Sequence, residues 1–407
     1  MLTKVKNSEN AVAPVIGFML ILAILFLAAA QYQMNVVPAQ ERGEEIDHFT
    51  EVTGDISGLR SSIIQTSSTG QLQTQEMDLG VNYNVLGLTQ PPQSGSLAYI
   101  NTSNITIRNA QNNKEASNYW RGDVNRTYRT GIIQYRIDYN LVQSHADLYL
   151  EHGFMYRDTE RGSDEVINMI PESEQSIINE RSITLYTIRS ELNTQQYNPV
   201  TVETKPISAP MNSVAITNVQ NGDPIKLEIP TRLSVQNWTR ILEDELESEN
   251  DDGFVTDINE GVENNTIELV LKENETYNLR MARVDMNTQI QQTANAITEP
   301  QYIAVNTQSA NVREGGSISL DAEVRDKFNN GVIGIPVDVE AQDAGRICIG
   351  DFAGTSSTTK STNCDNQGDY RQPGEDISSA DGSVSYIYNA PELGNNRDIT
   401  FTYRIDE

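Results

Sequence analysis

The sequence predicts a mainly β protein that is held in a membrane by one N-terminal transmembrane helix. Three observations predict it: a long apolar run near the N-terminus, an amphipathic segment after that run, and many short segments in which apolar and polar residues alternate. We expect a short amphipathic stalk, a β-sandwich middle domain with one helix, and a C-terminal β-sandwich. The expected ranges are a cytoplasmic lead (1–10), the transmembrane helix (11–36), the stalk helix (37–66), a β-rich extracellular domain (67–287), a linker (288–300) and the C-terminal domain (301–407).

The apolar run covers residues 11–30, AVAPVIGFMLILAILFLAAA, and contains no charged residue. As a helix it would be about 30 Å long, which matches the hydrocarbon thickness of a bilayer. A secretory signal cleaved near 28–30 and a buried core helix are the alternatives. We favour a retained membrane helix because the run is longer than a usual signal and the rest of the chain is too polar to enclose it. The residues expected to contact lipid are Val15, Ile16, Phe18, Leu20, Leu22, Leu25 and Phe26.

The charges on either side of the run predict its orientation. Lys4 and Lys6 precede it, whereas Glu41, Glu44 and Glu45 follow it. Because basic residues stay on the cytoplasmic side of a membrane helix, the N-terminus is expected in the cytoplasm. The sequence therefore predicts a single-pass protein of the cell membrane, with everything after about Gln31 outside the cell.

The composition is strongly acidic. The 407 residues include 57 Asp and Glu but only 29 Lys and Arg, which gives a formal net charge of −28. Such a surface stays hydrated in concentrated salt, where charge repulsion is screened within about 3 Å, so we expect a halophilic source. The same charge repels phosphates, and we therefore expect no nucleic-acid partner. Membrane lipid is the predicted partner, with copies of the same chain or other envelope proteins as further candidates.

The stalk is predicted from apolar residues that recur every three or four positions between 41 and 64. Pro38 is expected to kink or break the chain between the membrane helix and the stalk. The apolar stripe is expected to pack on the following domain, and a helix from a second copy is the alternative partner. The stripe residues are Ile46, Phe49, Val52, Ile56, Leu59 and Ile63.

The segment NAVAPVIGFMLILAILFLAA resembles the N-terminus of haloarchaeal type IV pilin-like proteins, in which an AVSPVIG-type motif opens a hydrophobic helix. The resemblance implies display on the cell surface and assembly through the apolar helix. One departure matters: Glu9 and Asn10 stand where such precursors usually carry a basic residue before the cleavage point. An uncleaved anchor is therefore the expectation, and a filament subunit is the alternative.

Strands are predicted in the middle domain at 79–88, 95–108, 131–138, 146–156, 182–190 and 226–229. One helix is predicted near 237–246, with Asn237 as its N-terminal cap. The segments LGVNYNVLGLTQPPQSGSL and IPTRLSVQNWTRILEDEL are similar to segments of haloarchaeal secreted, pilin-like proteins of unassigned function. This resemblance implies a β-rich extracellular domain behind a membrane anchor and brings no known active site.

The C-terminal domain is predicted from alternating segments at 314–326, 334–339, 381–388 and 399–403, with a turn at 329–331. This pattern resembles a bacterial Ig-like domain of the invasin/intimin type, with its glycine-led strand, Asp-x-x-Asn turn and late Asp-Gly hairpin. An Ig-like β-sandwich is the fold that the resemblance implies.

Two kinds of covalent modification are predicted outside the cell. Cys348 and Cys364 are the only cysteines, and an extracellular pair is expected to form a disulfide. Asn-x-Ser/Thr sequons occur at six asparagines, of which Asn237 is expected to act as a helix cap instead. The remaining candidates for glycosylation are Asn101, Asn104, Asn125, Asn264 and Asn274.

No catalytic motif is found in the sequence, and the three histidines are scattered. The acidic run at 243–252 lacks acids at two required positions of a calcium loop, so a solvated acidic segment is expected. We therefore expect no catalytic residues, no metal and no cofactor. The expected function is that of a structural or adhesion protein on the surface of a halophilic archaeon; a pilin-like filament subunit and an anchored extracellular enzyme are the alternatives.

Overall fold

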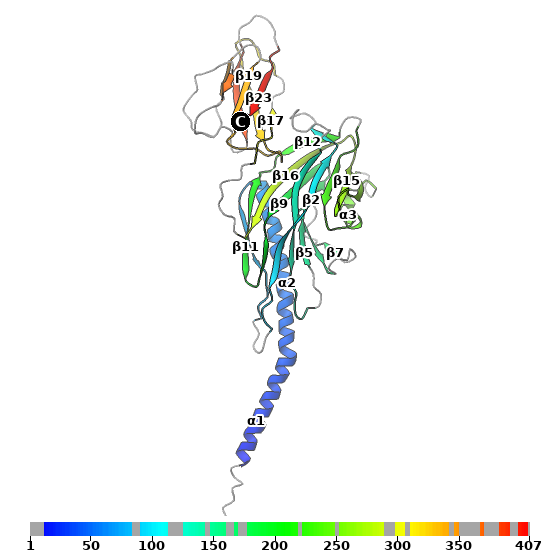
Figure 1. The fold of residues 1–407 in the computed structure, drawn as a ribbon, viewed down its shortest axis with the longest axis vertical. Helices are drawn as coiled ribbons and strands as arrows, with labels where there is room; N and C mark the ends of the chain where they lie inside the picture. The colour runs from blue at the N-terminus through cyan, green and yellow to red at the C-terminus, as the bar shows by residue number, and fades with distance from the viewer. Residues whose placement is uncertain are drawn as a thin grey trace, which may run out of the picture.

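A long helix projects from one end of an elongated β structure, and a smaller β unit lies at the opposite end (Figure 1). We call the β structure of residues 70–288 the head and the unit of residues 298–405 the module. The computed structural model describes residues 12–83, 90–112, 125–142, 147–159, 167–169, 177–218, 222–248, 252–288, 298–305, 310–341, 346–349, 367–369, 382–390 and 398–405.

The helix runs without a break from the apolar segment into the head. Helix α1 covers Val12–Gln31, a π-helical segment covers Tyr32–Val36, and helix α2 covers Val37–Thr69. The helix ends at Gly70, whose left-handed φ of +67° closes the last turn through a bond of its N–H to the Thr66 carbonyl.

Pro38 was expected to kink or break the chain; the helix is distorted directly before it but does not break. Pro38 lies in the first turn of α2, directly after the π-helical segment. There the N–H of Val37 bonds to the carbonyl of Tyr32, five residues earlier, so one turn holds an extra residue. The wider turn leaves room for the proline ring, which would otherwise clash with the carbonyl of the preceding turn.

The head contains two sheets. The seven-stranded sheet consists of β1 (Gln73–Asp78), β11 (Pro199–Ser208), β16 (Thr276–Asn287), β12 (Ser213–Asn218), β3 (Ala110–Asn112), β8 (Ile178–Asn179) and β9 (Ser182–Ser190). The nine-stranded sheet consists of β14 (Val255–Glu260), β15 (Thr266–Leu271), β13 (Lys226–Pro230), β2 (Gly95–Arg108), β4 (Arg126–Arg136), β5 (Asp147–Glu151), β6 (Phe154–Asp158), β7 (Ile167–Met169) and β10 (Asn193–Gln196). Strands β9 and β16 pair in parallel, whereas the other paired strands of the described residues are antiparallel.

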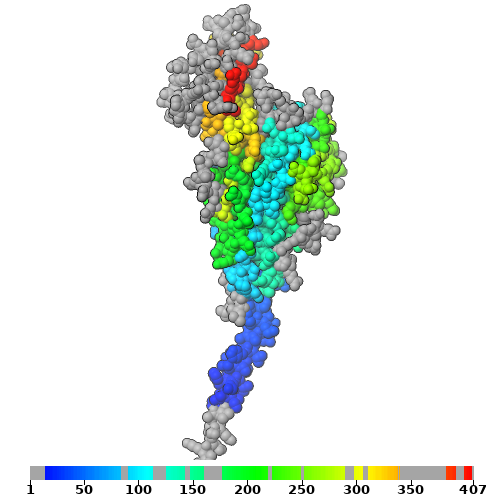
Figure 2. All heavy atoms as spheres, viewed as in Figure 1, coloured from blue at the N-terminus to red at the C-terminus, as the bar shows by residue number. Residues whose placement is uncertain are grey.

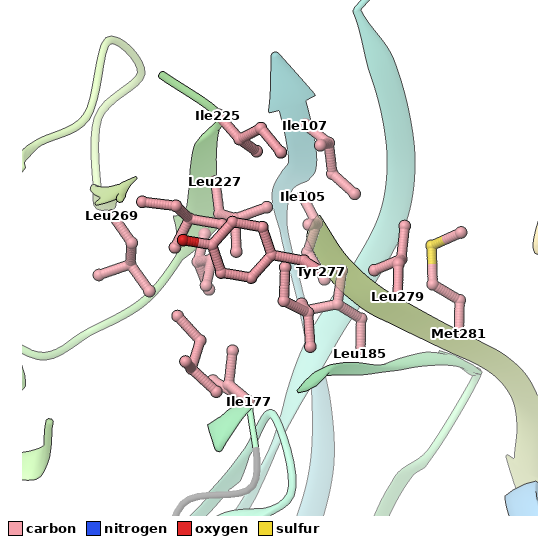
Figure 3. Packing of buried hydrophobic residues seen from close by; sticks show 14 of the residues in the cluster. Ile105, Ile107, Ile177, Leu185, Ile225, Leu227, Leu269, Tyr277, Leu279 and Met281 are labelled. Carbon is pink, nitrogen blue, oxygen red and sulfur yellow. The ribbon is translucent and has the colours of Figure 1, made fainter. Parts of the chain in front are cut away.

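Two buried apolar clusters join the sheets. The distal core combines side chains of both sheets, among them Ile105, Leu227, Tyr277 and Leu279 (Figure 3). The basal core lies toward the projecting helix and includes residues of α2 as well as of both sheets. Four of the six residues expected in the stalk stripe are buried there, and each contributes about 1.5–3 kcal/mol of hydrophobic stabilisation: Val52, Ile56, Leu59 and Ile63.

The module has two sheets around its own apolar cluster. One sheet contains β17 (Tyr302–Val305), β18 (Ser317–Arg325), β22 (Ser383–Asn389) and β20 (Arg346–Ile349), and the other contains β21 (Gln367–Asp369), β19 (Val337–Ala341) and β23 (Phe401–Ile405). The mainly β class with an apolar N-terminal helix is thus confirmed, whereas the Ig-like sandwich is not confirmed, since the sheets curl as half-barrels.

Several predicted elements have the expected bounds, and others do not. The strands predicted at 95–108 and 182–190 are β2 and β9. The strand predicted at 146–156 is a hairpin of β5 and β6, because His152 and Gly153 adopt positive φ values between them. The strand predicted at 79–88 is wrong in its described part, 79–83, which forms one isolated bridge from Val81 to Gln93; residues 84–89 lie outside the described chain.

The helix of the head is α3 (Val235–Ile241), followed by a 3₁₀ turn, η3 (Glu243–Glu245). The cap is Ser234 rather than Asn237: the Ser234 hydroxyl accepts the backbone N–H of Asn237. Asn237 occupies the third helical position, and its backbone N–H is the donor that the Ser234 side chain caps. The prediction failed because Ser234 and Asn237 are both good capping residues three positions apart.

Candidate functional site: the anchor helix and its junction with the head

The apolar residues of α1 are exposed to the surroundings. The seven residues expected to contact lipid have exposed fractions from 39% at Leu22 to 67% at Phe26. Figure 2 shows this part of the helix projecting from the head without any cover. By length and composition the helix that starts at Pro14 contains a segment able to cross a membrane. An uncovered helix of this kind avoids water only in lipid or against other apolar helices.

A buried carboxylate holds α2 to the base of the head. Glu45 is fully buried and accepts the Tyr83 hydroxyl at 2.6 Å. It also accepts the backbone N–H groups of Asn140 at 2.9 Å, Leu141 at 3.0 Å and Val142 at 2.7 Å. Four donors therefore satisfy one carboxylate, as burial of a charge requires. Burial and the bond to Glu45 raise the pKa of Tyr83 well above its ordinary value, so this hydroxyl stays a donor.

Two further polar residues of α2 extend this junction. Glu41 accepts the backbone N–H of Gln90 at 2.7 Å. His48 Nε2 lies 3.1 Å from the Asp78 carbonyl, and its Nδ1 lies 2.7 Å from the Tyr139 hydroxyl. A carbonyl only accepts, so Nε2 carries the proton and Nδ1 accepts from Tyr139. Burial lowers the pKa of His48, which keeps the ring neutral in this role.

Further along α2, polar contacts continue on both sides of the helix. Asp55 accepts the backbone N–H of Asp78 at 3.0 Å, Arg60 Nε donates to the Gly153 carbonyl, and the Thr66 hydroxyl lies 3.3 Å from the Thr204 carbonyl. From Glu41 to Thr66 the helix covers about 37 Å. Over this length the helix is a core element of the head rather than a detachable stalk.

A cavity of about 290 Å³ opens beside this junction. The guanidinium of Arg157 lies 4.6 Å from the centre of the Phe49 ring at its edge. The acid–base groups that face the cavity, Glu45 and Tyr139, are already bonded to the chain, and catalysis requires such groups to face a substrate. The geometry therefore fits a structural role at this junction. The lining residues are Glu45, Ile46, Phe49, Thr50, Tyr139, Val142, Arg157 and Thr159.

The burial of the polar residues at this junction was not predicted from the sequence. Glu41, Glu45 and His48 continue the spacing of Val52 and Ile56 along the same face of the helix. That register was the available signal, because polar residues in line with an apolar stripe face the same neighbours. Ile46, by contrast, was expected in the buried stripe and is 50% exposed, so that part of the prediction is wrong.

The five sequons proposed for modification are exposed, and Asn237 is buried. Asn101 and Asn104 lie on β2 at an irregularity of its pairing with β4. The others lie before β4 or on either side of β15: Asn125, Asn264 and Asn274. The side-chain amide of Asn237 donates to the Ser234 hydroxyl at 3.0 Å, which leaves it poorly placed for a glycan.

The structure describes one of the two cysteines. Cys348 lies on β20, which pairs with β22. Cys364 lies outside the described residues, so the disulfide stays a prediction. Among the described residues no group of three or more His, Cys, Asp or Glu is arranged to hold a metal ion.

Comparison of the chain with protein-family models, with curated proteins and with solved structures gives no match. The class that fold and site define is accordingly a coarse one: a mainly β protein whose N-terminal helix is long and apolar enough to anchor it in a membrane.

Proposed function

We propose that this chain is a single-pass surface protein of a halophilic archaeon, which holds its head and module outside the cell for adhesion or for organisation of the envelope. The observation that carries the proposal is the continuity of one helix from the exposed apolar segment into the basal core. About 20 apolar residues span the hydrocarbon layer, and the next helical turns enter the head with no flexible segment between. A head held in this way keeps a fixed distance from the membrane.

The proposed orientation places the N-terminus in the cytoplasm. It is supported by Lys4 and Lys6 before the helix and by the acidic residues after it. The exposed sequons, and the disulfide expected between the two cysteines, suit an extracellular compartment. The net charge of −28 suits a surface that faces concentrated salt. The module, which we propose to be Ig-like, would be the part farthest from the membrane and therefore the first to meet a partner.

A second candidate function is that of a pilin-like filament subunit. It is favoured by one observation: α1 is apolar and exposed on every side, which suits packing against helices of other copies as well as against lipid. The two functions differ at the N-terminus, since a filament subunit would lose the segment before residue 11. Mass spectrometry of the mature N-terminus separates them, and an intact junction between Lys4 and Ala11 rejects the filament. The third possibility, an anchored extracellular enzyme, is favoured by no observation of the described residues.

The test of the surface proposal is protease treatment of intact cells, followed by fractionation. We expect the head and module to be digested in whole cells and the helix to remain with the membrane. The double variant Leu20→Arg and Leu25→Arg should leave the membrane fraction, because each central arginine costs about 2.5–3.5 kcal/mol. Val262→Arg, at a position 77% exposed on the head, is the matched control and should stay. Recovery of undigested head from whole cells would refute the orientation.

A further inference from the structure

Most of one turn of the module is buried, and within it only Lys327 is exposed. The turn covers residues 326–331, between β18 and β19, and we call it the plug. Turns usually lie at the surface, because their polar backbone groups need water. Here the exposed fractions of Asp326, Phe328 and Asn329 are 0%, and that of Asn330 is 1%. The head must therefore replace the water that this turn would otherwise contact.

The aromatic ring of the plug enters the distal core. Phe328 packs on Tyr128 of β4, with ring centres 5.4 Å apart, and belongs to the same buried cluster. The guanidinium of Arg283, on β16, lies 5.9 Å from the same ring. The hydroxyl of Tyr128 reaches back to the Lys327 carbonyl at 3.3 Å. One side chain of the module thus fills a place in the apolar core of the head.

The neighbouring asparagine makes three hydrogen bonds across the boundary. Asn330 Nδ2 donates to the Ser208 hydroxyl and to the Met281 carbonyl, both at 2.8 Å. Its Oδ1 accepts the backbone N–H of Asn212 at 2.7 Å. A buried amide with three partners in the head has a strongly specified position, because any displacement leaves these groups unpaired.

Bonds within the module also hold the shape of the plug. The Asp326 carboxylate accepts the backbone N–H groups of Phe328 at 2.8 Å and Asn330 at 3.1 Å, which closes the turn from within. Asn329 adopts a φ of +71° and accepts the Tyr302 hydroxyl, so β17 supports the turn from the module side. A turn held in this way loses little conformational entropy on docking.

Strand β16 connects the plug with the anchor helix. Its Met281 carbonyl receives Asn330, and further along the strand Val284 and Met286 belong to the basal core with Val52 of α2. One strand therefore touches the module at one point and the membrane-bound helix at another. Hydrogen-bonded strands and packed helices transmit displacement with little deformation, since their interiors are close-packed.

From these contacts we infer that the plug is a mechanical lock. While it is seated, head and module move as one body, and a load on the module passes through Phe328, Asn330 and β16 to α2. The segment 289–297 that joins head and module in sequence is then bypassed by the load. A partner that pulls on the module would pull directly on the membrane helix. This deepens the proposed surface function, but the lock itself can be tested without a membrane.

The test is force spectroscopy of the full chain in detergent micelles, with handles at Asp47 and at the end of β23. The wild type should keep the module docked until the head yields. Asn330→Ala should add an early step at low force that releases up to about 30 Å, the extended length of the nine residues 289–297 between head and module. We expect the ratio of undocked to docked molecules without load to rise roughly tenfold to a hundredfold.

Two further variants keep the test decisive. Ser208→Ala removes one partner of Asn330 from the head side, so the same early step cannot be ascribed to a misfolded module. Arg313→Ala changes an exposed residue of the module and should behave as the wild type. The inference is overturned if the wild type releases its module at the force seen for Asn330→Ala. It is also overturned if Asn330→Ala and Ser208→Ala both behave as Arg313→Ala does. Whole-cell proteolysis decides the surface function independently of either result.

Discussion

The Glu45 carboxylate on α2 accepts the backbone N–H of Val142 at 2.7 Å, across 97 residues of chain. The bond joins α2 to the loop that follows β4, close to the point where the helix leaves the head (Figure 1). Because the same carboxylate also accepts the two neighbouring N–H groups, one side chain holds residues 140–142 of this loop.

The first prediction concerns this carboxylate. Glu45→Gln should lower the free energy of unfolding by about 1–3 kcal/mol, because an amide NH₂ group would face backbone donors in a buried site. Chemical denaturation in high salt measures the change. Glu44→Gln is the control, since the neighbouring residue carries the same charge and is only half-buried. Equal stability of the two variants would show that the junction does not depend on Glu45.

The second prediction concerns pH. Burial raises the pKa of Glu151 from 4.5 to about 7, although Thr231, Tyr156 and the backbone of Arg232 bond to it. The folded state therefore holds a proton that the unfolded state has lost, and stability falls as the pH rises from about 4.5 to 7. The loss should reach about 3 kcal/mol in the wild type.

Glu151→Gln separates this effect from general repulsion among the acidic residues. The variant cannot titrate at this position, so its unfolding free energy should change less between pH 5 and pH 8 than that of the wild type. Urea titrations at constant high salt provide the comparison. Parallel pH profiles for the two proteins would mean that Glu151 does not titrate in this window.

The third prediction concerns the cysteines. If Cys348 and Cys364 form a disulfide, a reducing agent should lower the stability of the module by about 3 kcal/mol. Differential scanning calorimetry with and without reductant gives the measurement. The variant Cys364→Ser should match the reduced wild type and should not respond to reductant. An unchanged melting temperature of the wild type would argue against the disulfide.

The fourth prediction concerns glycosylation. Glycopeptides should be found at exposed sequons such as Asn264 and Asn274, and none should be found at the buried Asn237. Asn237→Gln should leave the intact mass of the glycoprotein unchanged apart from the substitution, whereas Asn274→Gln should remove one glycan. Mass spectrometry of protein purified from its native surface checks both. A glycan on Asn237 would mean that α3 forms only after modification.

The alternation of apolar and polar residues was enough to predict part of the fold. Strands β2 and β9 alternate apolar and polar residues over part of their length, and their predicted ends agree with the structure. Strand β1 escaped prediction because its residues are polar: Met77 alone is buried, and the other side chains are exposed or half-buried at the edge of the sheet. Alternation is visible only where one face of a strand meets an apolar core.

The contacts that define the sites depend on distant parts of the chain. The register of Glu45 with the apolar stripe of α2 indicates its burial, but its donors near Val142 come from another element and have no signal in the sequence. The turn containing Asn330 was predicted correctly as a turn, but its burial depends on Ser208 and Met281 in the head. A single sequence gives no sign of such pairings, since they follow from the tertiary arrangement of elements that are separately predictable.

The π-helical segment at Tyr32–Val36 has a geometric consequence for the whole molecule. One extra residue in a turn rotates everything beyond it by about 100° around the helix axis, relative to a regular helix. The orientation of the head around the axis of α1 is thus set by the five residues of this segment. Deletion of one of them would let the turn return to regular helix and keep the same orientation, whereas deletion of a residue in the regular part of α1 would turn the head by about 100° toward a different neighbour.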